Sequence, residues 1–142
     1  MRKQGDQYLN LVKIHHVAII VSDYQRSKLF YTETLGFKII AENYRAAKKS
    51  YKLDLVLPHG DRLELFSFED APPRPSFPEA LGLRHLAFEV QNLGATVDYL
   101  KLKGITPEII RTDEYTLKKF TFIQDPDGLP IELYEAGTSN PV

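Results

Sequence analysis

Runs of apolar residues and short polar breaks follow one another along the chain in an order that occurs twice. The apolar runs at 13–21 and 83–90 have the length and the Val, Ile and Leu content of buried strands. Each run is followed by a helix-capping residue, Asp23 or Asn92, and then by the apolar spacing of a helix. Three shorter apolar runs come after each helix. The pattern predicts two copies of a β-α-β-β-β unit, which is an α+β fold built from a repeat.

Glycine and turn residues set the other boundaries. The first helix is expected over 24–34, with Gly36 behind it as at a helix C-cap. The second helix is expected over 93–103, followed by Gly104. Residues 125–128, Asp-Pro-Asp-Gly, have the composition of a type I turn. The strands that follow the helices are expected at 37–41, 51–57, 63–68, 107–112, 118–124 and 130–135.

A cluster of four prolines interrupts the repeat between its two copies. Within residues 69–81 the prolines are too close together for a helix or a central strand. We therefore expect a single domain, residues 1–142, with a first module at 13–68, a connector at 69–81 and a second module at 82–136. A short lead-in is expected at the N-terminus, and no regular structure after Gly137.

Length and composition narrow the class of protein. A chain of 142 residues with 43% hydrophobic and 26% charged residues is typical of one globular domain. Its net charge of -1, without a basic block, argues against nucleic acid as a partner. The sequence has neither an apolar signal core nor a long apolar run, which predicts a cytoplasmic protein without a membrane partner. Because the chain has no cysteine, disulfides, thiolate metal sites and cysteine nucleophiles are excluded.

Residues able to bind a metal occupy matched positions in the two copies. Glu64 lies 48 residues after His16, and Glu132 lies 47 residues after His85. Side chains alternate along a strand, so each Glu is directed to the face opposite its apolar neighbours. Two such carboxylates would repel each other unless a cation lay between them. The repeat therefore predicts that His16, Glu64, His85 and Glu132 converge on one divalent ion.

A lone His or Glu on an apolar strand is more often a core or edge residue than a metal ligand, and only the joint pattern favours the metal. His15, next to His16, is expected on the opposite face of the strand. Imidazole nitrogens and carboxylate oxygens without thiolates suit a borderline first-row metal.

With these residues the chain resembles the vicinal oxygen chelate superfamily, which includes glyoxalase I, extradiol dioxygenases, fosfomycin-resistance proteins and methylmalonyl-CoA epimerase. In particular it is similar to the small bacterial glyoxalase-like proteins. The resemblance extends over residues 13–136 and rests on segments 16–23, 30–31, 35–37, 63–65, 84–88, 125–128 and 131–133. It implies two β-α-β-β-β modules that form a mixed-sheet incomplete barrel around one metal.

The resemblance also implies a ligand set and a metal. The four ligand positions correspond to His16, Glu64, His85 and Glu132, which is the glyoxalase I set. The dioxygenases and fosfomycin-resistance proteins have no Glu at the place of Glu64. The implied cofactor is one divalent ion, with zinc or nickel favoured over cobalt, manganese or iron. Ile20 and Phe68 stand where glyoxalase I enzymes commonly have residues that bind glutathione, so a smaller or more apolar substrate is expected.

The implied function is that of a metal-dependent lyase or isomerase, similar to lactoylglutathione lyase, acting on a small oxygen-chelating substrate. The reaction would pass through a metal-stabilised enediolate, with Glu132 or Glu64 as the base. The candidates for substrate contact are Tyr44, Arg45, Tyr115 and Lys119. Two alternatives stay open: a metal-dependent dioxygenase, and a non-enzymatic binding or resistance protein of the same fold. All four ligands lie in this chain, so a dimer is not required for the site, although homodimers are common in the superfamily.

Overall fold

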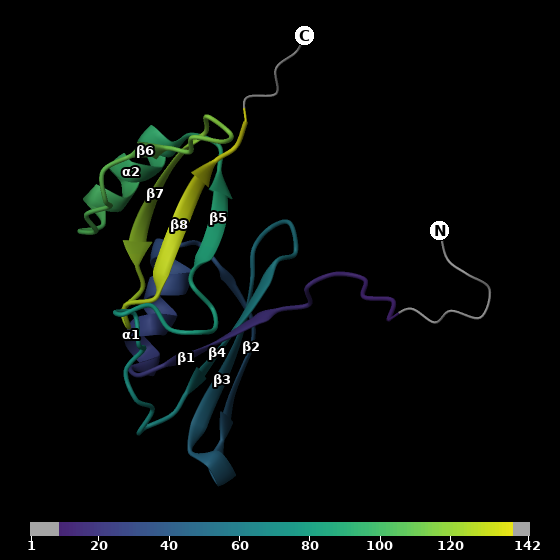
Figure 1. The fold of residues 1–142 in the computed structure, drawn as a ribbon. Helices are drawn as coiled ribbons and strands as arrows, with labels where there is room; N and C mark the ends of the chain where they lie inside the picture. Colours follow the sequence, from purple (N-terminus) through teal and green to yellow (C-terminus); the bar gives the residue numbers. More distant parts are fainter. Residues whose placement is uncertain (1–8, 138–142) are drawn as a thin grey trace, which may run out of the picture.

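The computed structural model describes residues 9–137, which form two modules with the same order of elements (Figure 1). The predictions made for residues 1–8 and 138–142 lie outside the described residues. The first module consists of β1 (Val17–Val21), α1 (Tyr24–Leu29), the π-helical turn η1 (Phe30–Thr34), β2 (Lys38–Arg45), the 3-10 turn η2 (Ala46–Lys48), β3 (Ser50–Val56) and β4 (Arg62–Ser67).

The second module repeats the order of the first. It consists of β5 (Leu86–Val90), α2 (Leu93–Leu102), β6 (Arg111–Thr112), β7 (Lys119–Gln124) and β8 (Pro130–Glu135). The predicted α+β fold of two β-α-β-β-β units is therefore confirmed.

Each module forms one four-stranded mixed sheet, with strand orders β1-β4-β3-β2 and β5-β8-β7-β6. In both sheets the first strand pairs in parallel with the last, and the other pairs are antiparallel. The two sheets are separate and do not close into a barrel. β1 and β5 are therefore edge strands, whose outer backbone groups have no strand partner within this part of the chain.

Both helices begin at the predicted caps. The Asp23 carboxylate accepts a hydrogen bond of 3.1 Å from the Arg26 N–H, and the Asn92 side chain accepts one of 2.9 Å from Ala95 N–H. The first helical segment ends at Gly36, whose φ of 86° is the left-handed conformation that glycine adopts readily. No helix within residues 9–137 is long and apolar enough to span a membrane.

Three strands, β1, β5 and β6, are at least three residues shorter than the sequence predicts, and β5 begins at Leu86 rather than at residue 83. β1 begins at Val17 rather than at residue 13, because its partner β4 begins at Arg62 and offers no backbone groups beyond that point. β6 has two residues instead of six. Pro107 has no N–H to donate, and the stretch before β6 reaches β7 through a backbone bond from Glu108 N–H to the Phe122 carbonyl.

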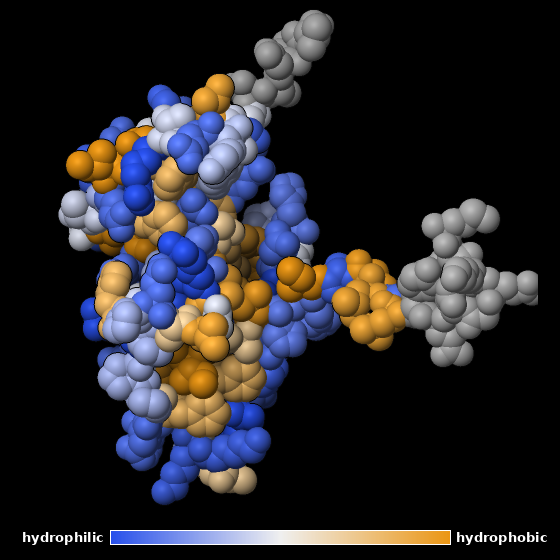
Figure 2. All heavy atoms as spheres, viewed as in Figure 1, coloured by the Kyte–Doolittle hydropathy of each residue, from blue (hydrophilic) through white to orange (hydrophobic). Residues whose placement is uncertain are grey.

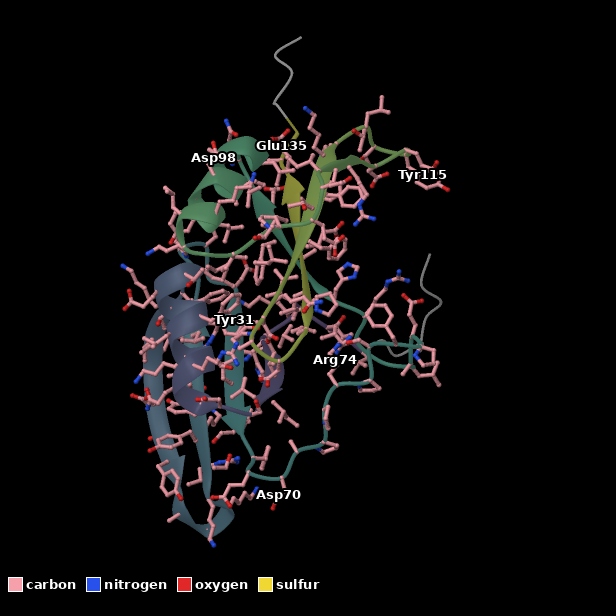
Figure 3. The ribbon with its side chains drawn as sticks, turned by 90° about the vertical axis from the view of Figure 1, so that its left-hand side faces the viewer. Tyr31, Asp70, Arg74, Asp98, Tyr115 and Glu135 are labelled. Carbon is pink, nitrogen blue, oxygen red and sulfur yellow. The ribbon has the colours of Figure 1, made fainter. Side chains whose placement is uncertain are left out.

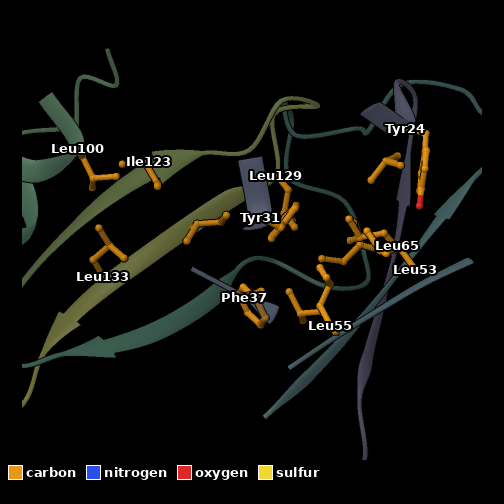
Figure 4. Close-up of a cluster of buried hydrophobic side chains, with 14 of the residues drawn as sticks. Tyr24, Tyr31, Phe37, Leu53, Leu55, Leu65, Leu100, Ile123, Leu129 and Leu133 are labelled. Carbon is orange, nitrogen blue, oxygen red and sulfur yellow. The ribbon is translucent and has the colours of Figure 1, made fainter. Parts of the chain in front are cut away.

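The core lies against the helix-bearing faces of the two sheets. Leu63 and Leu65 on β4, and Ile131 and Leu133 on β8, are at most 4% exposed. They belong to one hydrophobic cluster that is continuous across both modules, with Tyr31, Phe37 and Leu129 between the two ends (Figure 4). Burying a large apolar side chain stabilises a fold by about 1.5–3 kcal/mol, so these alternating leucines and isoleucines fix which face of each sheet points inward.

Polar contacts also join the modules where the core passes from one to the other. The hydroxyl of Tyr31, which lies at this junction (Figure 3), donates a 2.8 Å hydrogen bond to Asp125, and both residues are buried. Burial, followed by the negative charge of Asp125, raises the pKa of Tyr31, so the donor proton is retained. Asp125 opens the predicted turn, which the bond from Gly128 N–H to the Asp125 carbonyl closes.

Candidate metal and substrate site

The first His–Glu pair is brought together by the parallel pairing of β1 and β4. His16 directly precedes β1, and Glu64 lies in β4 between the two buried leucines. Since Val17 pairs with Leu63, His16 lies beside this end of β4. Its Nδ1 is 3.3 Å from Oε2 of Glu64, whose side chain is 10% exposed.

The second pair repeats this arrangement in the other module. His85 directly precedes β5, and β5 is parallel to β8, with Leu86 opposite Ile131. Nε2 of His85 is 3.3 Å from Oε1 of Glu132, and their side chains are 27% and 16% exposed. The structure thus contains both of the His–Glu pairs that the repeat predicts.

The spacing within each pair suits a shared metal ion. Zinc bonds to imidazole nitrogen at about 2.0–2.1 Å and to carboxylate oxygen at about 2.0–2.2 Å. Two such ligands at tetrahedral or octahedral angles have donor atoms about 3.0–3.4 Å apart. The nitrogen and oxygen atoms of both pairs, 3.3 Å apart, fit this range. The donors present therefore match the divalent ion expected from the sequence.

The two pairs do not meet within one chain. Among residues 9–137, the one group of three or more potential ligands whose donor atoms lie within 4.8 Å of one another is His15, His16 and Glu64. The expectation that four ligands converge inside a single chain is therefore wrong. The physical reason is that the modules join through their helix-bearing faces, while Glu64 and Glu132 lie on the opposite faces of their sheets.

His15 also departs from its expected position. Its Nδ1 lies 2.9 Å from Nδ1 of His16, and not on the opposite side of a strand. The alternation rule fails here because both histidines precede β1, which begins at Val17. His15 is consequently a second nitrogen donor, and a third potential ligand, beside the first pair.

Charged residues surround the first pair. The Lys52 ammonium is 2.8 Å from Asp54 and 3.6 Å from Oε1 of Glu64. The hydrogen bond with Asp54 raises the pKa of Lys52, so the lysine stays charged through the neutral range. Arg45 lies further along the same face, with its guanidinium carbon 4.9 Å from the centre of the Phe66 ring. The first pair is therefore set in a polar, charged surface.

Aromatic residues surround the second pair. Phe122 pairs with Glu132 across β7 and β8, and its ring lies edge-on to the His85 ring at 5.2 Å. Arg111 lies over this ring and is bound to Glu108 at 3.0 Å. An open cavity of about 540 Å³ borders His85, and its lining includes Arg74, Phe77, Arg84, His85, Arg111 and Phe122.

Of the four predicted substrate contacts, the structure places one on the face that carries a His–Glu pair and three elsewhere. Arg45 pairs with Ser50 and lies on the Glu64 face of its sheet. Tyr44 lies on the other face, against Tyr51 at 4.8 Å between ring centres, because neighbouring residues of a strand alternate. The prediction for Tyr44 is corrected accordingly.

The two predicted contacts in the second module also need correction. Lys119 precedes Phe120 on β7 and so points away from the face that carries Phe122 and Glu132. Tyr115 is 88% exposed at the turn before β7, at the outer end of the module (Figure 3). Neither side chain lies beside a His–Glu pair.

The sequence reading missed Lys52, Arg111 and Phe122. For Lys52 and Phe122 the alternation of side chains along the strand was a signal. Phe122 pairs directly with Glu132, and Lys52 stands two residues from Asp54, which pairs with Glu64, so both side chains lie on the same face as the Glu of their module. For Arg111 there was none, since its position over two aromatic rings depends on the pairing of β6 with β7.

Comparison with known proteins defines the class to which this fold and these pairs belong. Residues 13–133 match the Glyoxalase/Bleomycin resistance protein/Dioxygenase superfamily, and the chain belongs to that family. Members of this superfamily commonly bind a divalent metal.

Several relatives are similar over nearly their whole length. The chain is 58% identical to the "Uncharacterized protein YwkD" of Bacillus subtilis over 125 residues, which cover 88% of this chain and 98% of the relative. It is 52% identical to a glyoxalase family protein from Enterococcus faecalis whose crystal structure is known. The two structures match with a TM-score of 0.82, over 87% of this chain and 97% of the other. A probable lactoylglutathione lyase of Vibrio parahaemolyticus is more distant, at 27% identity, and the match covers 87% of this chain and 90% of the relative.

Proposed function

We propose that this protein is a divalent-metal-dependent lyase or isomerase of the glyoxalase type, acting on a small molecule with two neighbouring oxygen atoms. The observation that carries the proposal is the duplicated pair, His16 with Glu64 and His85 with Glu132, each at 3.3 Å. The distant similarity to lactoylglutathione lyases agrees with this chemistry. The donor set favours zinc or nickel, with cobalt, manganese or iron as alternatives.

The complete site requires two copies of the chain in this proposal. The His16–Glu64 pair of one copy faces the His85–Glu132 pair of the other, and a two-fold axis generates two equal sites. The unpaired edges of β1 and β5 are available to a second copy. So is the apolar arm that leads into His16 and stands away from the body in Figure 2. Its Leu9, Leu11, Val12 and Ile14 are 81–91% exposed.

A metal held by these pairs would act as a Lewis acid that polarises a substrate carbonyl or hydroxyl oxygen. The residues of the chain then have to bind the substrate, exclude water and take a proton from the adjacent carbon. A carboxylate beside the reacting carbon is the nearest base. Glu132 suits this task because its one ion pair among the described residues, with His85, uses Oε1 and leaves Oε2 available. Both oxygens of Glu64 have partners, His16 on Oε2 and Lys52 on Oε1.

Proton exchange tests the proposal without knowledge of the natural substrate. The metal-loaded protein is incubated in D₂O with a panel of α-hydroxycarbonyl compounds and thiohemiacetals, and exchange at the carbon beside the carbonyl is followed by NMR. We expect E132Q to lose exchange on every compound that the parent protein accepts. The expected loss is about 100-fold or more, the usual size of a general-base contribution. Metal content is measured in parallel.

A matched control is Glu33→Gln, which removes one exposed carboxylate on η1, outside both pairs, and should leave exchange unchanged. If the purified protein binds no divalent metal, or if E132Q and E64Q both retain full exchange, the proposed function is wrong. Metal-dependent uptake of oxygen in place of proton exchange would point instead to a dioxygenase.

A further inference from the structure

Arg45 lies on the Glu64 face of its sheet and packs against aromatic rings. Its guanidinium lies over the Phe66 ring at 4.9 Å and near the Phe68 ring at 6.0 Å, and the residue is half-buried. Among residues 9–137 it forms no ion pair with an acidic side chain. Within the described part of the chain, the one hydrogen bond of its guanidinium runs from Nη2 to the Ser50 hydroxyl at 3.0 Å, and its buried Nε has no partner there.

This environment lacks the anion or hydrogen-bond acceptors that a partly buried cation needs. A partly dehydrated guanidinium is unfavourable unless an anion or several acceptors replace the lost water, and aromatic rings replace it only in part. Two other cations beside the pairs have acids: Lys52 has Asp54 and Glu64, and Arg111 has Glu108. Arg62, two residues before Glu64 on β4, forms no ion pair among the described residues either, and what distinguishes Arg45 is its position over the rings of Phe66 and Phe68. Arg45 therefore presents an unsatisfied donor, Nε, and an uncompensated charge on the face that carries Glu64.

The spacing along β4 relates Arg45 to the His16–Glu64 pair. Phe66 stands two residues after Glu64 on the same face, which is about 7 Å along a strand. The ring of Phe66 is contacted by Arg45 and approached by the Lys52 ammonium at 6.0 Å. A ligand bound at Glu64 could therefore extend over Phe66 and place its far end against the guanidinium.

We propose that Arg45 binds an anionic group, a carboxylate or a phosphate, at the end of the substrate remote from the two chelating oxygens. Guanidinium is suited to this role because its planar array of N–H donors matches a carboxylate or phosphate in a bidentate manner. The substrate class is then a small compound with vicinal oxygens at one end, an apolar middle that crosses Phe66, and a negative charge at the other end. This inference rests on the proposed function for the metal end only.

The anion site is tested first without metal. Inorganic phosphate and succinate are titrated separately into the metal-free protein, and the Nε–H resonances of arginine are followed by NMR. Arg45 should shift with a saturable dependence on one or both anions, and the better anion identifies the group. Arg26 is an internal control, because it is exposed on α1, which covers the face of the sheet opposite Glu64. An Arg45 signal that does not move, or that moves no more than that of Arg26, overturns the proposal.

The link to the metal is tested with two hydroxamates, which chelate through vicinal oxygens. Adipic monohydroxamate carries a terminal carboxylate, and hexanohydroxamate does not. The metal-loaded protein should bind the charged compound about tenfold more tightly, as expected for a hydrogen-bonded charge pair. R45M should abolish this preference, and R45K should restore part of it.

These measurements separate the two proposals. If neither hydroxamate binds but phosphate or succinate still shifts Arg45, the proposed metal function fails and the anion site stands. If both hydroxamates bind equally to the parent protein, the anion site is wrong and the metal function stands.

Discussion

The two modules carry the same His–Glu pair at the same spacing, but the residues around each pair differ in kind. In the first module Lys52, His15 and Arg45 place charges and nitrogen donors beside Glu64. In the second, Phe122 packs edge-on against His85, and the one nearby cation of β6, Arg111, is neutralised by Glu108. The repeat has therefore kept the donors and changed their surroundings. This difference is consistent with the separate tasks proposed for the halves: binding of an anionic substrate group in the first, and proton transfer by Glu132 in the second.

The largest expected effect, a loss of bound metal, comes from removing the histidine ligand of one module at a time. H16A and H85A should each lose nearly all bound metal, since each removes one donor of every site. When the two variants are mixed under conditions that exchange subunits, half of the dimers contain one intact site out of two. Metal content should then recover to about a quarter of the parent value, if the halves come from different copies.

Metal analysis of the mixture, after removal of free ion, gives the answer directly. The control is each variant passed through the same exchange procedure alone, which should show no recovery. Absence of recovery in the mixture, together with metal bound by a monomeric parent protein, would mean that the halves meet within one chain.

A smaller effect is expected at the contact that holds the modules together. Y31F removes the buried hydrogen bond to Asp125 and leaves that carboxylate without the Tyr31 donor. The loss should be about 1–3 kcal/mol in the free energy of unfolding, measured by urea denaturation. Y115F is the matched control, because Tyr115 is 88% exposed, and it should change stability by less than about 0.5 kcal/mol. Equal effects from the two variants would show that this contact does not couple the modules.

The sequence predicted the architecture because the alternation of side chains is a local property. Leu63 and Leu65 on one side of β4 and Glu64 on the other follow from parity alone, and so do the equivalent residues of β8. The caps at Asp23 and Asn92 and the turn at 125–128 were equally local signals.

The arrangement of the modules could not be predicted in the same way. It depends on contacts between distant residues, such as Tyr31 with Asp125 and Phe37 with Phe88, which no periodicity encodes. The alternation of side chains along a strand could have excluded Tyr44 and Lys119 as substrate contacts, since each is adjacent in sequence to a residue on the face that carries the Glu ligand. It could not have found that Arg45 lacks an acid, because an ion pair requires the positions of all nearby acids.

A modest effect is expected from removing the lysine that distinguishes the first half. K52M abolishes an ammonium 3.6 Å from Glu64, which competes with a divalent ion for the same carboxylate. Metal affinity, measured by competition with a chelator, should rise about threefold, a size consistent with a partly exposed ion pair. K28M is the control, because Lys28 pairs with Glu42 and not with a proposed ligand, and it should leave the affinity unchanged. A weaker affinity in K52M would show that Lys52 supports the carboxylate in its binding position.

The smallest effect is expected at Tyr44, the residue next to Arg45. Because the two side chains lie on opposite faces of β2, Y44F should change the affinity for adipic monohydroxamate by less than about twofold, whereas R45M should lower it about tenfold. Isothermal titration of the metal-loaded variants measures both values. The Tyr44 ring stays against Tyr51 in the phenylalanine variant, so the fold should be preserved. A comparable loss in both variants would mean that R45M acts by disturbing β2, and the contrast between the charged and aromatic halves would then lose its functional meaning.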